Sequence, residues 1–159
     1  MGNWADFFTA ELGAAAALTG LIIVGISINV TRILTDPALP GRAAETLVLP
    51  TGVLVASTYA LVPHQPIGLL GAELASTGFV MWLIPSLIHI RAFRMPSAAM
   101  SRLIPRMALT LFSSWPFVAS GVLLLLHVNG ALYWCVSGVV VALIATVINA
   151  WVLLVEILR

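Results

Sequence analysis

The feature that most constrains this chain is the length of its apolar segments. Residues 131–155 contain no charged side chain, and about 20 apolar residues in a helix suffice to cross a bilayer. Five long segments of low charge follow one another, at about 7–34, 44–62, 67–90, 104–126 and 131–158. Helices are expected in all of them because lipid offers the backbone no hydrogen-bond partners. The sequence therefore predicts an all-α, polytopic transmembrane helical bundle with five spans.

The low charge of the chain supports the same class. Only 8% of the residues are charged and 61% are hydrophobic, whereas soluble domains carry roughly 25% charged residues. Too little polar surface is left to cover a water-soluble protein, so we expect one transmembrane domain over 1–159 that has the lipid bilayer as its partner. The net charge of +1 provides no basic patch, which argues against a nucleic-acid partner.

The positions of the arginines predict the orientation. With five spans, all basic residues fall on one face, where they flank the first loop, flank the third loop or end the chain: Arg32, Arg42, Arg91, Arg94, Arg102, Arg106 and Arg159. Because positively charged loops stay in the cytoplasm, the N-terminus is expected outside and the C-terminus inside. The arginines of the third loop are also candidate contacts for anionic lipid headgroups, although a role in setting the topology is sufficient to explain them.

One carboxylate lies inside a run that is otherwise apolar or small. Glu73 occurs in GLLGAELASTG, residues 68–78, and a charge within the bilayer costs about 3 kcal/mol on insertion scales. No basic residue is available at its depth. Side chains near the same outer end could hold its carboxylate, and these are His64, His127, Ser76 and Thr77. A bound ion or a retained proton could also balance its charge. Functional use of Glu73 and a structural role as a protonated donor between helices both remain open.

A second acid and two histidines belong to the same outer end. Glu11 stands in the tripeptide Ala-Glu-Leu, as Glu73 does, early in a span that runs in the same direction. Loops at this end carry His64 and His127, and carboxylates with imidazoles can bind a cation or relay protons. The spacing matches no metal motif, so the metal is left unknown and no cofactor is expected. Solvated interfacial side chains are the alternative for both histidines.

Amides mark the opposite, cytoplasmic half. Asn29, near the end of the first span, and Asn149, within the fifth, are candidates for lining the inner half of an ion or proton pathway. A bridge between helices or subunits is the alternative for Asn149. Nearby we expect ordinary interfacial ion pairs: Glu45 with Arg42 or Arg32, and Glu156 with Arg159.

The first quarter of the chain resembles a known group of membrane proteins, and this suggests where the protein is located. The stretch FFTAELGAAAALTGLIIVGISINVTRILTDPALPGRAAETL, residues 7–47, is similar to the opening of a group of small bacterial multi-pass membrane proteins of uncharacterised activity. The resemblance implies a bacterial inner (plasma) membrane location. It transfers no activity and no site residue.

Three functional classes remain open. The first is a homo-oligomeric cation or proton channel or transporter, with Glu73 and Glu11 at its outer end and Asn29 and Asn149 in its inner half. The second is a non-catalytic accessory or scaffolding subunit that contacts other membrane subunits. The third is a quinone-binding or redox membrane protein. No motif fixes a reaction, so the sequence favours a protein that is not an enzyme.

Overall fold

The structure, a computed structural model, describes residues 2–36, 39–93 and 100–158. These residues form six helices and no strand. In chain order the helices are α1 (Gly2–Ile28), α2 (Val30–Thr35), α3 (Leu39–Ala60), α4 (Ile67–Phe93), α5 (Met100–Leu125) and α6 (Ala131–Leu158). The all-helical class predicted from the sequence is confirmed.

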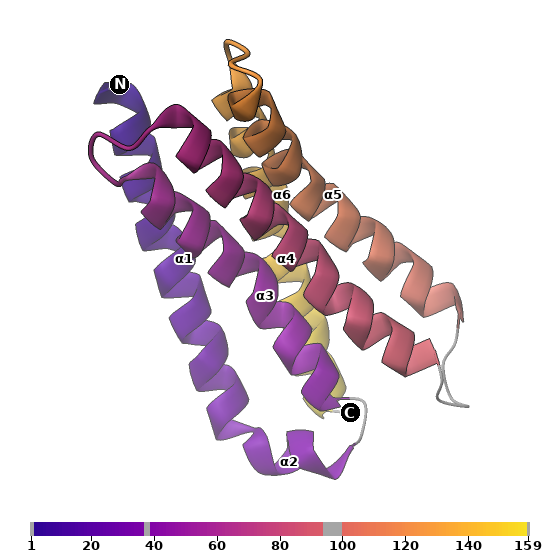
Figure 1. The fold of residues 1–159 in the computed structure, drawn as a ribbon. Helices are drawn as coiled ribbons and strands as arrows, with labels where there is room; N and C mark the ends of the chain where they lie inside the picture. Colours follow the sequence, from indigo (N-terminus) through magenta and orange to yellow (C-terminus); the bar gives the residue numbers. More distant parts are fainter. Residues whose placement is uncertain (1, 37–38, 94–99, 159) are drawn as a thin grey trace.

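The five long helices alternate in direction along the bundle, and the short α2 closes one end (Figure 1). The N-terminus, the α3–α4 turn and the α5–α6 turn lie together at what we call the upper end. The C-terminus and α2 lie at the lower end. Residues far apart in the chain therefore meet at each end, and each end forms a separate candidate site.

Helix α3 is the centre of the bundle. It packs against α1, α4 and α6, while α4 packs on α5 and α5 on α6. Leu49, Val53 and Ala56 on α3 are buried in the main apolar core, where they join Leu74 of α4 and Phe117 of α5. Helix α3, which packs against more helices than any other described helix, therefore buries one face in the core along much of its length.

Helices α4 and α5 approach closely because glycines face each other across their contact. A Cβ atom on Gly121 would lie 2.5 Å from the carbonyl oxygen of Gly71 and 2.4 Å from the backbone nitrogen of Ala75. A Cβ on Gly78 would lie 2.7 Å from the backbone nitrogen of Val118. Small residues at a helix contact allow such backbone approach in membrane bundles. The small residues around Glu73 are thus explained by packing.

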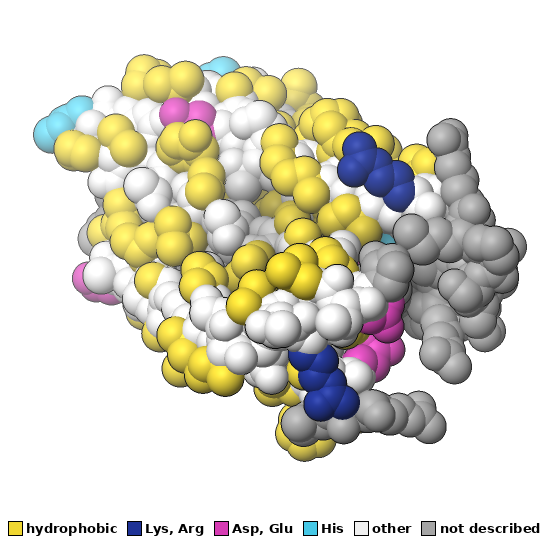
Figure 2. Space-filling view, turned by 90° about the horizontal axis from the view of Figure 1, so that it is seen from below, with side chains coloured by type: hydrophobic (Ala, Val, Ile, Leu, Met, Phe, Trp, Pro, Cys, Tyr) yellow, Lys and Arg dark blue, Asp and Glu magenta, His cyan; other side chains and the backbone are white. Residues whose placement is uncertain are grey.

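Four helices in the described part of the chain are long and apolar enough to cross a membrane. They cover Trp4–Ile28, Ile67–Arg91, Met107–Leu125 and Ala131–Ile157. Seen from the lower end, hydrophobic side chains cover much of the flank of the bundle (Figure 2). The sequence predicted α3 as a further span, but α3 does not reach the same apolarity. Because α3 packs against α1, α4 and α6, it can bury polar groups on those sides that a helix facing lipid all round would expose.

The first predicted span, 7–34, is not one continuous helix. Helix α1 ends at Ile28, and Asn29 separates it from α2 with φ −105° and ψ 12°. The Asn29 Nδ2 donates to the carbonyl oxygen of Gly25 over 2.8 Å. Side-chain bonds of this kind compete with the helical hydrogen-bond pattern, and apolar periodicity alone does not reveal them.

Candidate functional site

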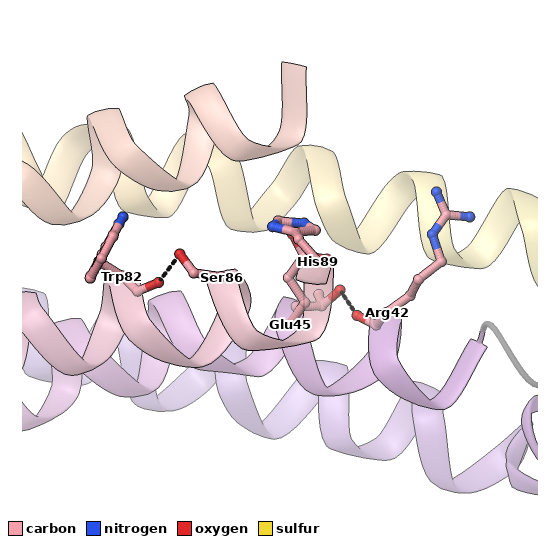
Figure 3. A network of polar contacts seen from close by, with 6 residues as sticks. Arg42, Glu45, Trp82, Ser86 and His89 are labelled. Atoms are coloured by element: carbon pink, nitrogen blue, oxygen red, sulfur yellow. Dashed lines mark hydrogen bonds and ion pairs between the residues drawn. The ribbon is translucent and has the colours of Figure 1, made fainter. Parts of the chain in front are cut away.

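Two ionisable side chains face each other inside the lower end. His89 Nε2 on α4 lies 3.1 Å from Glu45 Oε1 on α3. His89 is only 2% exposed and Glu45 only 6% exposed, and Figure 3 shows them turned toward each other between neighbouring helices. Among the residues that the structure describes, His89 Nε2 has no hydrogen-bond partner of good geometry. The pair is therefore close enough to exchange a proton and is not locked by a well-aligned bond.

An ion pair lies directly beside this pair. Arg42 on α3 contacts the carboxylate of Glu156 on α6, and its side chain extends toward α6 (Figure 3). Arg42 precedes Glu45 by three residues, a spacing that places both on one side of a helix. We call Arg42, Glu45, His89 and Glu156 the lower cluster. It joins α3, α4 and α6, which is a contact among segments that are distant in sequence.

The charges of the lower cluster do not balance by themselves. An arginine stays charged at all accessible pH values, so one guanidinium faces the two carboxylates of Glu45 and Glu156. With both acids ionised and His89 neutral, one negative charge is in excess. A net charge beside the buried Glu45 and His89 is costly, and one proton on either of them removes it. The neutral form of the cluster thus contains one exchangeable proton.

A small cavity adjoins both pairs between α3 and α6. Its volume is about 10 Å³, and it is lined by Arg42, Glu45, Thr46, Asn149 and Leu153. The Thr46 hydroxyl donates to the carbonyl oxygen of Arg42 over 2.9 Å. Four of the five lining side chains are polar, which is unusual for the interior of an apolar bundle.

Of the two interfacial ion pairs predicted from the sequence, the one for Glu45 was wrong, and the one between Glu156 and Arg159 stays a prediction. Glu45 was expected to pair with Arg42 or Arg32, but it faces His89. Glu156 was expected to pair with Arg159, which lies outside the described residues; among the described residues Glu156 pairs with Arg42, a partner that the sequence did not suggest. The prediction used neighbours in sequence, and the actual partners depend on which helices pack together. One feature of the sequence could have suggested the Glu45–His89 pair. Both residues lie near the arginine-rich ends of their predicted spans, and therefore at a similar depth in the bilayer.

At the upper end, Glu73 has a partner that sequence reasoning missed. The amide nitrogen Nε2 of Gln65, in the α3–α4 turn, donates to Glu73 Oε2. Ser76 and Thr77 donate over 2.9 and 2.7 Å, but to the backbone carbonyl of Glu73 and not to its carboxylate. The carboxylate is therefore held locally, by a residue that the chain places eight positions away.

Glu11 does not join Glu73. It lies three residues after Phe8 and four before Ala15, both buried in the core, so it is on the side of α1 that packs on α3. Its Oε2 atom is buried with no hydrogen-bond partner among the described residues. Helix α3 lies between α1 and α4 (Figure 1), and this separates the two glutamates.

The two outer histidines occupy turn positions. His64 and His127 are exposed and have φ angles of 57° and 56°, a region that only glycine, asparagine, aspartate and histidine visit with some frequency. At the end of α5, Val128 N–H donates to the carbonyl of Leu123 and His127 N–H to that of Leu124, which is the Schellman pattern of a helix C-terminus. Within the described ranges, no three His, Cys, Asp or Glu side chains gather as a metal site.

The remaining predicted site residues lie at the lower end or outside the description. Asn29 is used locally by its bond to Gly25, whereas Asn149 lines the cavity of the lower cluster. Arg91 is exposed at the end of α4. Arg94 lies outside the described residues, as do the side chains of Arg102 and Arg106. Their predicted contacts with lipid headgroups stay predictions.

Compared with protein-family models, with curated proteins and with solved structures, the chain matches none. Its function is therefore inferred from the geometry of the two ends. Of these, the lower cluster has the more unusual chemistry, because it brings together ionisable groups from three helices, two of them buried.

Proposed function

We propose that this chain is a five-span membrane protein of the bacterial inner membrane that moves protons or small cations. Four apolar helices and α3, which runs alongside them, would form the spans. Arg32, Arg42 and Arg91 lie at the lower end, so the positive-inside rule supports a cytoplasmic lower end and an outer upper end. The resemblance of residues 7–47 supports the bacterial location.

The observation that carries the proposal is the buried pair of Glu45 and His89. Ionisable residues in membrane helices are costly, and they commonly mark ion or proton pathways. At 1.5 Å per residue, Glu45 lies about 9 Å above the start of α3, inside the bundle and beyond the terminal turn. A carboxylate and an imidazole 3.1 Å apart can pass one proton between them, since both groups can either hold a proton or accept one.

The upper end has a different part in this proposal. Glu73 and Glu11 are the groups that an ion or proton would meet first from outside. Glu73 already accepts a hydrogen bond from Gln65, and one carboxylate oxygen of Glu11 is buried without a second ionisable group beside it among the described residues. The sequence favoured Glu73 as the working acid. We now assign that role to Glu45, because Glu45 faces a second ionisable group on another helix and Glu73 faces a neutral amide.

The test is proton flux into liposomes that contain the purified protein and an internal pH-sensitive dye. Flux is driven by a potassium diffusion potential. Glu45→Gln and His89→Gln, which keep the side chains polar, are expected to reduce flux to the level of protein-free liposomes. Ser137→Ala is the matched control, because this exposed hydroxyl donates only to the carbonyl of Trp134 within its own helix.

Three outcomes separate the alternatives within this test. Unchanged flux in both variants would contradict the proposal. Loss of flux in Glu73→Gln with normal flux in Glu45→Gln would return the working acid to the upper end. Flux that follows a sodium gradient and not the pH gradient would assign the pathway to a small cation.

A second candidate function is assembly with other membrane subunits, and α1 favours it. Gly13, Gly20 and Gly25 have open space where a Cβ atom would stand, and Gly13 with Ala17 forms a small-xxx-small pair of the kind found at helix contacts in membranes. Ala17→Cys in a Cys135→Ala background tests this face. Disulfide-linked dimers in the membrane would support a homo-oligomer, whereas an unlinked protein that co-purifies with a second subunit would support an accessory role.

A further inference from the structure

The cavity between α3 and α6 has the size and lining of a site for a single water molecule. A cavity of about 10–15 Å³ holds one water when two to four polar groups can bond to it, and this one measures about 10 Å³. We propose that one water molecule binds there and bridges the two pairs of the lower cluster. The inference deepens the proposed proton function and rests on it for the role of the water, while the binding of the water can be measured separately.

The lining groups supply the bonds that a bridging water needs. The Arg42 guanidinium is a donor and the Glu45 carboxylate an acceptor, so a water between them can accept from the first and donate to the second. The Thr46 hydroxyl donates its hydrogen to the carbonyl oxygen of Arg42, so its oxygen can still accept a hydrogen bond from the water. The Asn149 amide makes no side-chain hydrogen bond with any described residue, and it offers both a donor and an acceptor to the cavity.

Electrostatics favours water over a metal cation in this cavity. The permanent positive charge of Arg42 lines it, and a second cation at contact distance would be repelled strongly in a medium of low dielectric constant. Each carboxylate already has an ionisable neighbour, Arg42 for Glu156 and His89 for Glu45, and the neutral form of the cluster, with its one proton, has no net charge to attract a cation. A neutral, amphoteric ligand fits both the donors and the acceptors.

The bridging water would connect two pairs that have no direct path. Glu45 and His89 hold the exchangeable proton, and the cavity wall runs from Glu45 to Arg42, the partner of Glu156 near the lower end of α6. A water in contact with Glu45 can take up or release that proton, since hydrogen-bonded water is nearly as good a partner as a direct contact. The cavity is thus the lower exit of the proposed path.

Hydroxyl-radical labelling by X-ray radiolysis tests the water directly, in the full protein held in lipid nanodiscs. Radicals formed from a bound water oxidise the side chain beside it even where bulk solvent is excluded. Leu153 lines the cavity and is 5% exposed, whereas Leu39 in the same apolar cluster is 7% exposed and is not part of the cavity wall. We expect oxidation of Leu153 and little oxidation of Leu39. Equal oxidation of both in the wild type would overturn the proposal without any variant.

Substitutions in the cavity sharpen the test. Asn149→Leu, which keeps the side-chain size but removes the amide, and Thr46→Val should lower the oxidation of Leu153 to the level of Leu39. Thr146→Val is the matched control, because this fully buried hydroxyl of α6 donates to the carbonyl of Ala142 and does not line the cavity. Oxidation of Leu153 that persists in Asn149→Leu would place the water elsewhere and overturn the proposal.

Flux measured on the same variants separates this inference from the proposed function. Labelled Leu153 in a protein without proton flux would keep the water site and reject the transport function. Normal flux in Asn149→Leu, with the labelling of Leu153 lost, would reject the water as part of the path and keep Glu45 and His89 as the working pair. Loss of both labelling and flux in that variant supports the full proposal.

Discussion

The two ends of the bundle both contain glutamates in apolar surroundings, but they hold them in different ways. At the upper end, Glu73 receives a hydrogen bond from Gln65, eight residues earlier in the same hairpin. At the lower end, Glu45 and Glu156 meet His89 and Arg42 on other helices. The upper acid is held by a local contact, and the lower acids are held by the packing of α3 between α4 and α6.

This difference follows from where the basic residues lie. The described arginines are all at the lower end, so an acid there can find a cation once the helices pack. The upper end offers amides and exposed histidines. A neutral partner can hold a carboxylate in place, but only a charged or titratable partner can balance its charge or share its proton.

The largest effect is expected when the ion pair of the lower end loses one partner. Breaking a buried ion pair by removing one partner costs about 3–5 kcal/mol. We expect Arg42→Leu to lower the free energy of unfolding by about 3 kcal/mol, the lower limit of that range, because both side chains of the pair are partly exposed. The measurement is reversible unfolding by SDS in mixed micelles. Arg32→Leu, which removes an exposed arginine of α2, should change stability by less than about 0.5 kcal/mol.

A double variant shows whether the loss comes from the unpaired acid. Arg42→Leu combined with Glu156→Gln should recover part of the stability lost in Arg42→Leu, since removing both charges of an ion pair inside a bundle is often nearly neutral. If the double variant is no more stable than Arg42→Leu, the arginine acts through its packing and not through Glu156.

A smaller loss of stability is expected when the Glu45 carboxylate is replaced by an amide. Glu45→Gln keeps the shape but leaves buried His89 with a weaker partner, which should cost about 1–3 kcal/mol. The same substitution at Glu73 leaves a neutral partner, Gln65, that can rotate its amide to accept a bond. Equal losses at the two sites in the same unfolding assay would remove the distinction between the two ends.

Much of the helical architecture was predictable from the sequence, and the lower cluster was not. Long apolar segments are a local property, and α6 begins at Ala131 as the pattern predicted. The break at Asn29 was missed because it depends on one side-chain bond to Gly25. The pairing of Arg42 with Glu156 was missed because it depends on the packing of α3 against α6, which apolar periodicity does not specify. Placing α3 at the centre would have drawn attention to Glu45.

The local contact at the upper end should contribute less to stability. Gln65→Ala removes the donor to Glu73, and a single hydrogen bond is worth about 0.5–1.5 kcal/mol. We expect a value near the lower limit, because water can replace the amide in this partly exposed turn. The SDS unfolding assay measures it, with Asn129→Ala in the other exposed upper turn as the control. A loss as large as that of Glu45→Gln would show that Glu73 is as strongly coupled to the bundle as the lower acids are.

The smallest effect is expected at His127, where it separates a structural role from a functional one. Its positive φ of 56° at the end of α5 is a conformation that glycine adopts without strain, so His127→Gly should raise the free energy of unfolding by less than about 0.5 kcal/mol, because glycine also gains freedom in the unfolded chain. If His127 serves only as this helix cap, proton flux in liposomes stays at the wild-type level. A stable variant that loses flux would instead show that the imidazole takes part in the path, and that the upper end shares the proton chemistry that we assign to the lower end.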